Sequence, residues 1–506
     1  MNKRLCWQGI DKWISEKKLA RILKDNLPSI DGLLLARPPK KPYAFLEFDT
    51  EERMNTFVEA FQPEIVNKKY KFKQATDRAI GKGKSIEEIL LSKPPKVTIE
   101  AQPLGPIEDK VTPYWNMQYS AQLLEKKNQV SKFYGTFLKD MEIKTKKSDT
   151  VPLQWLSEPP QVLDVKSSPA TEGYRNKVEY TIGYAENREI KVGFTNGQMA
   201  AGNLRVDSPE NCINISQFSK DIAVKVEECV KASGIPPVDT KTNEGVWKTV
   251  LLRTTTYTNQ SMLVLTVNDN HQISKIEQAL QPLSSEVDTL VLVVQKSPRQ
   301  IKVLSGSGFI TERLLNKTFQ ISPLSFFQVN TSGCEILYTE VMNSIEGELL
   351  LDICCGTGSI GICCSDKVKR IIGIEIVPEA VEDAIINAQM NNVSAEYKVG
   401  KAEDLMKDIS REVEGQVITG VVDPPRNGLH KNILTALRTT KGLDNLVYVS
   451  CNPETMFKDL VQLCAPESGK KFRAPPFVPL RVQPVDMFPH TPHVECVVAL
   501  KRITKL

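Results

Sequence analysis

The sequence lacks the segments that would carry a chain into or across a membrane. No stretch approaches the roughly 18 consecutive apolar residues of a membrane span, and the first residues contain no apolar core typical of a signal peptide. We therefore expect a soluble, intracellular protein without a membrane partner, located in the cytoplasm, the nucleus or both.

The cysteines are not arranged for disulfides or metal clusters. Thiols of an intracellular chain stay reduced, and among the 11 cysteines no Cys-x-x-Cys pair is matched by a second one. His490, His493 and Cys496 are spaced by three, but they lead into a strand-like segment whose successive side chains point to opposite faces. The sequence therefore predicts no metal site, neither zinc nor iron-sulfur.

Strong net charge is also missing. The value of +4 neither requires nor excludes nucleic acid, although residues 1–80 carry more basic than acidic side chains and could meet a polyanion there. A chain of 506 residues is too long for a single core, so we expect several domains.

Residues 1–76 predict a ferredoxin-like α+β domain, because strands and helices follow in the order β-α-β-β-α-β. Residues 41–48 resemble the first RNP segment of RNA-recognition motifs, with Pro42 where glycine is usual. A period of two places Tyr43 and Phe45 on one face, where aromatic rings can stack bases. Two alternatives stay open: both rings lie in the core, or the domain binds protein or only positions the RNA. Cys6 stands where an aromatic residue is common.

Residues 77–112 are rich in Lys, Pro and Gly and are predicted to be a linker. Their Gly83-Lys84-Ser85 resembles the end of a phosphate-binding loop, but Arg78 occupies the place of the first glycine and no strand precedes it. This excludes a nucleoside triphosphatase.

The rest of the chain divides by its pattern. Residues 113–335 predict a helical segment at 118–141 followed by a β-rich central domain. Residues 336–506 alternate buried-type strands with helices, which predicts a doubly wound α/β sheet.

A glycine turn, Gly356-x-Gly358-x-x-Gly361, follows the strand 349–353, and Glu375 ends the next strand, where its carboxylate can bind ribose hydroxyls. The pattern alone fits a dinucleotide as well. Asp352 before the turn, and the lack of a constellation for hydride transfer, favour S-adenosylmethionine.

Cys451 follows the apolar run 446–449, at the carboxyl end of a predicted strand. A lone cysteine there is usually a small buried hydrophobe. Combined with a methyl donor, however, a thiolate can add to C6 of a pyrimidine and make C5 nucleophilic. A base must then remove the C5 proton, and Glu495 suits that role.

Together these segments resemble the RNA uracil-5-methyltransferase family, which is matched over nearly the whole chain at 322–330, 423–426, 450–453, 489–495 and the glycine turn. Residues 112–123 resemble the eukaryotic tRNA branch, in which an RNA-recognition motif precedes the catalytic part. The cluster-ligating cysteines of the bacterial ribosomal-RNA branch are absent.

The resemblance implies a Rossmann-like class I methyltransferase domain at 336–506, an RNA-binding central domain, and methylation of uridine 54 in the T-loop of tRNA. We expect the protein to be a monomer. It implies Cys451 as the nucleophile and Glu495 as the proton acceptor. The other implied contacts are to the methyl donor (Gln328, Gly356, Gly358, Glu375, Asp423) and to the RNA (Phe326, Arg426, Arg175).

Two positions depart from the family pattern, since Cys354 is often aromatic there and Ser359 is often Asn. Two alternative functions remain: an RNA-binding or tRNA-folding protein with secondary catalysis, and a methyltransferase acting on ribosomal or messenger RNA.

Overall fold

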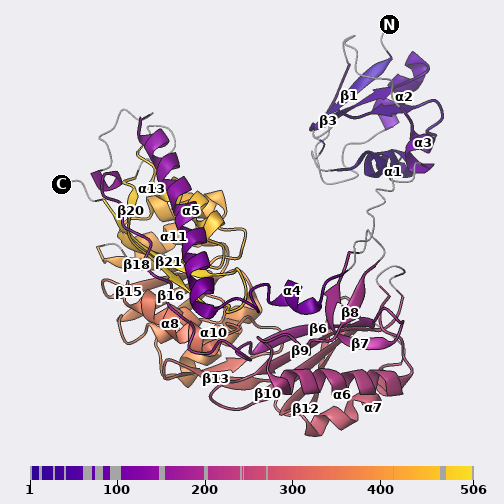
Figure 1. Ribbon diagram of the computed structural model, residues 1–506. Helices are drawn as coiled ribbons and strands as arrows, with labels where there is room; N and C mark the ends of the chain where they lie inside the picture. The colour runs from indigo at the N-terminus through magenta and orange to yellow at the C-terminus, as the bar shows by residue number, and fades with distance from the viewer. Residues whose placement is uncertain are drawn as a thin grey trace. The chain divides into compact units, whose positions relative to one another are not determined.

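A computed structural model of the protein describes residues 3–8, 10, 14–26, 29–38, 41–60, 71–74, 84–91, 104–146, 154–198, 203–239, 242, 244–268, 272–413, 415–467 and 474–503. The chain forms two compact units, 1–100 and 101–506 (Figure 1). Each unit is described by itself.

The first unit is an antiparallel sheet with the strand order β4-β1-β3-β2-β5, with helices between the strands. Its elements are β1 (Arg4–Gln8), α1 (Glu16–Asn26), β2 (Leu34–Ala36), β3 (Tyr43–Glu47), α2 (Glu51–Ala60), β4 (Lys71–Gln74), β5 (Lys84–Ser85) and α3 (Ile86–Leu91). The order β-α-β-β-α-β along the chain is the predicted one.

The strand β3 separates a buried face from an accessible one. Ala44 and Leu46 are fully buried, whereas Tyr43 and Phe45 are only partly buried on the opposite face. Their rings make an edge-on contact at 5.6 Å. The alternative that these two rings belong to the core is therefore wrong.

The predicted linker 77–112 requires correction at residues 84–91. Strand β5 pairs with β2, and Ile86 and Ile89 are 1% and 3% exposed in the core of the first unit. The Ser85 backbone N–H donates to Glu88 Oε2 at 3.0 Å and the Glu88 N–H donates to Ser85 Oγ at 3.1 Å, which is a capping box that starts α3. Residues 77–83 and 92–103 lie outside the described residues.

The second unit begins with a predominantly antiparallel seven-stranded sheet of the order β12-β11-β10-β9-β6-β7-β8, in which only β10 and β11 are parallel among the described strands. Its strands are β6 (Lys177–Tyr184), β7 (Ile190–Asn196), β8 (Arg205–Asp207), β9 (Trp247–Thr254), β10 (Ser261–Asn268), β11 (Thr289–Gln295) and β12 (Gln300–Ser305). Short helical turns lie at Gln154–Leu156 and Gln281–Ser285.

Helices cover one face of this central sheet, as Figure 1 shows for α6 (Gln217–Ser233) and α7 (Ile273–Leu280). The short helix α4 (Ile107–Val111) adds Ile107 to the same core, so these residues also do not belong to a linker. On the other face, Met262 and Val264 of β10 pack with the C-terminal sheet and with the hairpin of β13 (Ile310–Leu314) and β14 (Lys317–Ile321). The central and C-terminal sheets thus share one hydrophobic cluster.

The C-terminal sheet has the order β17-β16-β15-β18-β19-β21-β20, with β15 to β19 parallel and β21 antiparallel to both neighbours. This is the mostly parallel α/β sheet that the alternation of strands and helices predicts. The strands are β15 (Leu349–Ile353), β16 (Arg370–Glu375), β17 (Ala395–Val399), β18 (Ile418–Val422), β19 (Leu443–Ser450), β20 (Phe477–Val485) and β21 (Glu495–Arg502). The helices are α8 (Thr331–Met342), α9 (Ser359–Cys363), α10 (Pro378–Met390), α11 (Ala402–Glu412), α12 (Lys431–Thr439) and α13 (Pro453–Cys464).

The long helix α5 (Tyr119–Lys146) packs on the C-terminal sheet, although the sequence groups it with the central domain. Rings of Tyr134 and Phe137 lie 5.4 and 5.8 Å from Phe457 of α13, and the two helices run side by side in Figure 1. The helix therefore places residues from the amino-terminal half of the chain against the C-terminal sheet.

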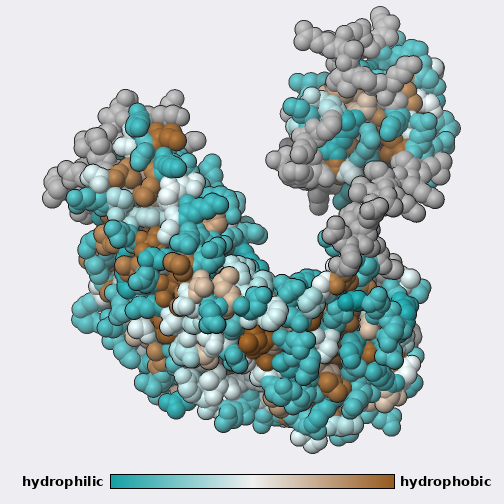
Figure 2. Space-filling view, in the orientation of Figure 1, coloured by the Kyte–Doolittle hydropathy of each residue, from teal (hydrophilic) through white to brown (hydrophobic). Residues whose placement is uncertain are grey.

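Among the described residues, no helix combines the length and apolarity that a bilayer crossing requires. On the face drawn in Figure 2, hydrophobic residues form separate groups among hydrophilic ones.

Candidate active site

A cleft of about 950 Å³ lies at the carboxyl ends of the parallel strands of the C-terminal sheet, which is where α/β sheets bind ligands. Residues from the central sheet complete its walls. The predicted site residues that line it are Arg175, Phe326, Gln328, Gly356, Glu375, Asp423, Arg426, Cys451 and Glu495. Tyr43 and Phe45 belong to the first unit.

The strand register explains why Cys451 and Glu495 meet. In the antiparallel pair of β19 and β21, Ser450 lies opposite Cys496. Cys451, the residue that follows β19, is therefore beside Glu495, the first residue of β21. Two positions 44 residues apart in the sequence become neighbours in the wall of the cleft.

The glycine turn after β15 forms one end of the cleft. Gly356 has φ +54°, and a Cβ placed on it would meet nothing within 4 Å, so the backbone is open to a ligand. Its N–H donates to Glu375 Oε2 at 3.0 Å. The other oxygen of Glu375 accepts N–H bonds from Ile376 and Val377 at 2.8 and 3.0 Å, which hold the carboxylate at the end of β16.

Gly358 is outside the lining of the cleft. It has φ +76° and stands before the first residue of α9, where an added Cβ would lie 2.6 Å from the hydroxyl of Tyr397. A glycine is therefore needed at this position for the turn and for close packing against Tyr397, and it does not contact the cleft.

Three carboxyl groups lie at or next to the ends of β15, β18 and β21: Asp352 and Glu495 are 1% and 4% exposed, and Asp423 is partly buried. Burial raises the pKa of Asp352 to about 7, against the hydrogen bond that its Oδ2 accepts from the Gly361 N–H at 2.9 Å. Burial, and then the neighbouring Asp352, raise the pKa of Asp423 to about 7. For Glu495, burial and then Asp423 raise the pKa well above its ordinary value, while Arg426 opposes this.

The Cys451 thiol is half-buried at the same place. Burial, then Glu495 and Asp423, raise its pKa to about 11, and the charge and hydrogen bond of Arg426 act in the opposite direction. The thiol is therefore protonated at neutral pH, and Arg426 is the group that favours the thiolate.

Hydrogen bonds fix Arg426 beside the thiol. The Arg426 carbonyl accepts from Asn452 Nδ2 and from Thr455 Oγ1, both at 3.0 Å. These bonds join the turn after β18 to the start of α13, and so connect the backbone of Arg426 to the segment that follows Cys451.

Phe326 is the most exposed aromatic side chain of the cleft, with 61% of its surface accessible. The sequence reasoning missed the buried Arg253, whose guanidinium donates to the Ser325 carbonyl and so supports the loop that presents Phe326. Arg253 lies in an apolar strand, so the sequence pattern gave no signal of a role for it.

Gln328 is 7% exposed, and its backbone carbonyl accepts from Asn176 Nδ2 at 3.0 Å.

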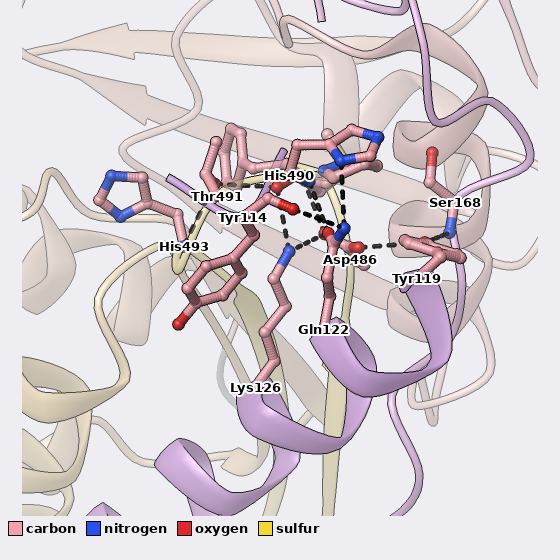
Figure 3. Close-up of polar contacts among 12 residues, drawn as sticks. Tyr114, Tyr119, Gln122, Lys126, Ser168, Asp486, His490, Thr491 and His493 are labelled. Atoms are coloured by element: carbon pink, nitrogen blue, oxygen red, sulfur yellow. Dashed lines mark hydrogen bonds and ion pairs between the residues drawn. The ribbon is translucent and has the colours of Figure 1, made fainter. Parts of the chain in front are cut away.

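The loop 486–494 is held by a buried polar cluster that the sequence also did not reveal (Figure 3). Lys126 and Asp486, both with fully buried side chains, form an ion pair at 2.6 Å between Nζ and Oδ1. The Tyr119 hydroxyl donates to Asp486 Oδ2 at 3.0 Å, and the His490 N–H donates to Gln122 Oε1 at 2.7 Å. Three residues of α5 thus position the loop that precedes Glu495.

The same loop gives Phe488, Thr491 and His493 to the wall of the cleft, in addition to the residues predicted as site residues. Among the described residues, at the cleft or away from it, no group of three His, Cys, Asp or Glu side chains is placed to hold a metal ion.

Known proteins resemble this chain in sequence over most of its length. A model of the tRNA (uracil-5-)-methyltransferase family matches residues 250–503. Human tRNA (uracil-5-)-methyltransferase homolog A is 32% identical over 432 residues, which are 79% of this chain and 68% of the human protein. Homolog B from Danio rerio is 32% identical over 420 residues, covering 78% of this chain and 86% of that protein.

A solved structure agrees with this. Pyrococcus abyssi tRNA (uracil-54, C5)-methyltransferase, crystallised with S-adenosyl-L-homocysteine, matches with a TM-score of 0.57 and 25% identity, covering 76% of this chain and 84% of that one. The family that the motifs predict is thereby confirmed, and the chain belongs to the tRNA (uracil-5-)-methyltransferase family.

Proposed function

We propose that this methyltransferase places a methyl group on C5 of uridine 54 in the T-loop of tRNA, through a covalent bond between Cys451 and C6. The observation that carries the proposal is the placement of the Cys451 thiol and the Glu495 carboxyl in the same cleft as the glycine turn and Glu375. The name of the archaeal relative, which specifies uracil 54, supports the choice of nucleotide.

As a member of this family the enzyme uses S-adenosylmethionine, which supplies an electrophilic methyl group when bound. The residues of the cleft fit it. Gly356 leaves open space above its backbone, and the Glu375 carboxylate can accept hydrogen bonds from the ribose hydroxyls. Gln328 and Asp423 line the cleft between this end and Cys451, where they would contact the donor near its reacting end.

The chain's own residues divide the remaining chemistry. The Cys451 thiol releases its proton to water, and Arg426 stabilises the thiolate. The thiolate adds to C6 and opens the C5–C6 double bond, so that C5 becomes nucleophilic. After methylation of C5, Glu495 accepts the C5 proton, the electron pair of the C5–H bond re-forms the C5–C6 double bond, and the thiolate leaves. The exchange of a proton for a methyl group at C5 is complete at that point.

A base in a folded loop must leave its stack to reach this cleft, which costs a few kcal/mol. The exposed ring of Phe326 offers a stacking surface, and Arg175 and Arg426 bring positive charge to the wall that the RNA would approach. The first unit acts with them as an RNA-recognition motif, whose partly exposed Tyr43 and Phe45 stack unpaired bases.

Two variants test the covalent step. Cys451→Ala should bind a T-arm hairpin but produce no 5-methyluridine. Glu495→Gln should form an RNA adduct that survives denaturing electrophoresis, because addition proceeds and elimination stalls. Turnover by Cys451→Ala would refute the covalent mechanism, and free RNA with normal turnover by Glu495→Gln would remove that residue from the role of base.

The substrate is tested separately by mapping 5-methyluridine in total RNA from cells with and without the protein. Loss of the signal at tRNA position 54 is the expected result. A loss confined to ribosomal or messenger RNA would transfer the same chemistry to another substrate.

A further inference from the structure

His493 presents its side chain to the cleft two residues before Glu495. Both residues line the cleft, whereas Val494 between them is 2% exposed and packs in the hydrophobic core. His493 and Glu495 thus flank a core residue at the start of β21, and both reach the same cleft. Glu495 is the deep member of the pair, at 4% exposure, and His493 is the exposed one.

The imidazole of His493 is not committed to any structural bond. In the part of the chain that the structure describes, neither ring nitrogen has a hydrogen-bond partner, and the backbone N–H alone donates, to Thr491 Oγ1 at 3.3 Å. The ring meets Phe488 edge-on at 6.2 Å. Figure 3 shows it pointing away from the cluster around Lys126 and Asp486.

Its surroundings favour the neutral form of the ring. The side chain is accessible from the cleft, but its partial burial lowers the pKa of His493, and the positive charges of Arg426, Lys126 and Arg175 lower it further. The acidic groups on the same wall are Glu495 and Asp423. A neutral imidazole can accept a proton on one nitrogen and release another from the second, so it suits a relay.

The reaction produces a proton that has to leave. In each cycle a methyl group replaces the C5 hydrogen, so one proton is released from the site for every methyl transferred. Glu495 accepts it, and as a buried carboxyl with a strongly raised pKa it retains a proton readily. Bound RNA would cover the cleft, so direct exchange with water would be slow.

We propose that His493 carries the C5 proton from Glu495 to solvent and so resets the base for the next turnover. The C5–H bond breaks toward the Glu495 carboxylate, one imidazole nitrogen of His493 takes the proton through a water molecule, and the other nitrogen releases a proton to bulk water. This inference rests on the proposed function, because it requires Glu495 to be the proton acceptor.

The test compares the first turnover with later ones in His493→Gln, which keeps a polar side chain but cannot carry a proton. A T-arm hairpin with tritium at C5 of the target reports proton release, and labelled methyl donor reports transfer. The variant should complete one turnover per enzyme at the normal rate and then slow by roughly 100-fold, the scale of general acid-base catalysis. Added imidazole should restore much of the later rate, and Cys451–RNA adduct should accumulate after the first turnover.

His430→Gln is the matched control. His430 is also an exposed histidine at this cleft, but its Nδ1 accepts from the Asn432 N–H at 3.3 Å and caps α12. It should show neither the burst nor a response to imidazole.

Two results would overturn the relay. One is an unchanged steady-state rate in His493→Gln, and the other is a loss accompanied by weaker RNA binding and no imidazole rescue, which would make His493 an RNA contact. Absence of 5-methyluridine with the unaltered enzyme would refute the proposed function instead, so the two failures are distinguishable.

Discussion

Breaking the buried ion pair between α5 and the loop 486–494 should cost far more than breaking an exposed pair on the same helix. The side chains of Lys126 and Asp486 are both 0% exposed, and Lys126 Nζ also donates to the Phe488 carbonyl at 3.0 Å. Lys126→Met leaves a buried carboxylate with only the Tyr119 hydroxyl and the Phe488 N–H as donors. Removal of one partner of such a pair costs about 3–5 kcal/mol.

The reverse change, Asp486→Asn, leaves the Lys126 ammonium buried without a counter-charge and should also cost about 3–5 kcal/mol. The double variant removes both charges. It should therefore be less destabilised than the sum of the single variants, with a coupling energy of about 2–3 kcal/mol. Equilibrium unfolding in urea, followed for the wild type, both single variants and the double variant, gives the four values.

Lys127→Met is the matched control, because the next residue of α5 forms an ion pair of the same 2.6 Å length with Asp164, but at the surface with side chains 34% and 93% exposed. Water already solvates those charges, so the urea midpoint should not move measurably. The reasoning is refuted if Lys126→Met costs no more than Lys127→Met, or if the two buried substitutions are additive. Because the loop leads to Glu495, Lys126→Met should also lower kcat more than it lowers RNA affinity.

Three further predictions concern the carboxyl groups, the glycine turn and the first unit. Burial raises the pKa of Asp352 to about 7, so its contribution to stability is full below about pH 4 and is lost as the pH rises through 7; Asp352→Asn should flatten the decline of the thermal midpoint between pH 5 and 8, and an unchanged slope would contradict this. Gly358→Ala should cost about 2–4 kcal/mol of stability, because the position has a positive φ and an added Cβ would lie 2.6 Å from the Tyr397 hydroxyl. Gly356→Ala, where the space is open, should cost about 1 kcal/mol of stability but weaken S-adenosylhomocysteine binding in calorimetry. Equal losses of thermal stability in the two variants would contradict this prediction. Tyr43→Ala and Phe45→Ala should each weaken binding of single-stranded RNA by about 1–3 kcal/mol without lowering stability, and unchanged affinity would separate the first unit from RNA.

Regular periodicity made most of the fold predictable. The apolar strand at 349–353 was expected and is found as β15, and the β-rich central region contains the predicted strands. The strands that were missed carry weak patterns. β17 is the polar edge segment Ala395–Val399, and β20 contains Pro479 and Pro484, which interrupt a strand signal.

Long-range packing was not predictable in the same way. The apolar face of α5 is evident in the sequence, but nothing local indicates that Tyr134 and Phe137 pack on Phe457, more than 300 residues away. The lysine at 126 looks like an ordinary surface charge of an amphipathic helix. Its burial depends on Asp486, which stands in a segment without periodicity.

The candidate site was predicted where chemistry dictates the residue type. Cys451 follows a strand, Glu375 ends one and Glu495 begins one, and the sheet topology brings such positions together. Arg253 was missed because it acts through a backbone carbonyl. His493 was considered only as a metal ligand, because the relay proposed for it depends on a neighbouring carboxyl.

The raised pKa of the Cys451 thiol favours RNA entry. Because this pKa is about 11, the thiol carries no charge in the resting cleft at neutral pH. An approaching phosphate backbone therefore meets Arg175 and Arg426 without an adjacent thiolate. A thiolate formed beforehand would offset these cations and weaken the attraction of the RNA. The protonated thiol thus favours substrate entry, and in the proposed mechanism the cost of creating the thiolate falls after the RNA has bound, where Arg426 offsets part of it.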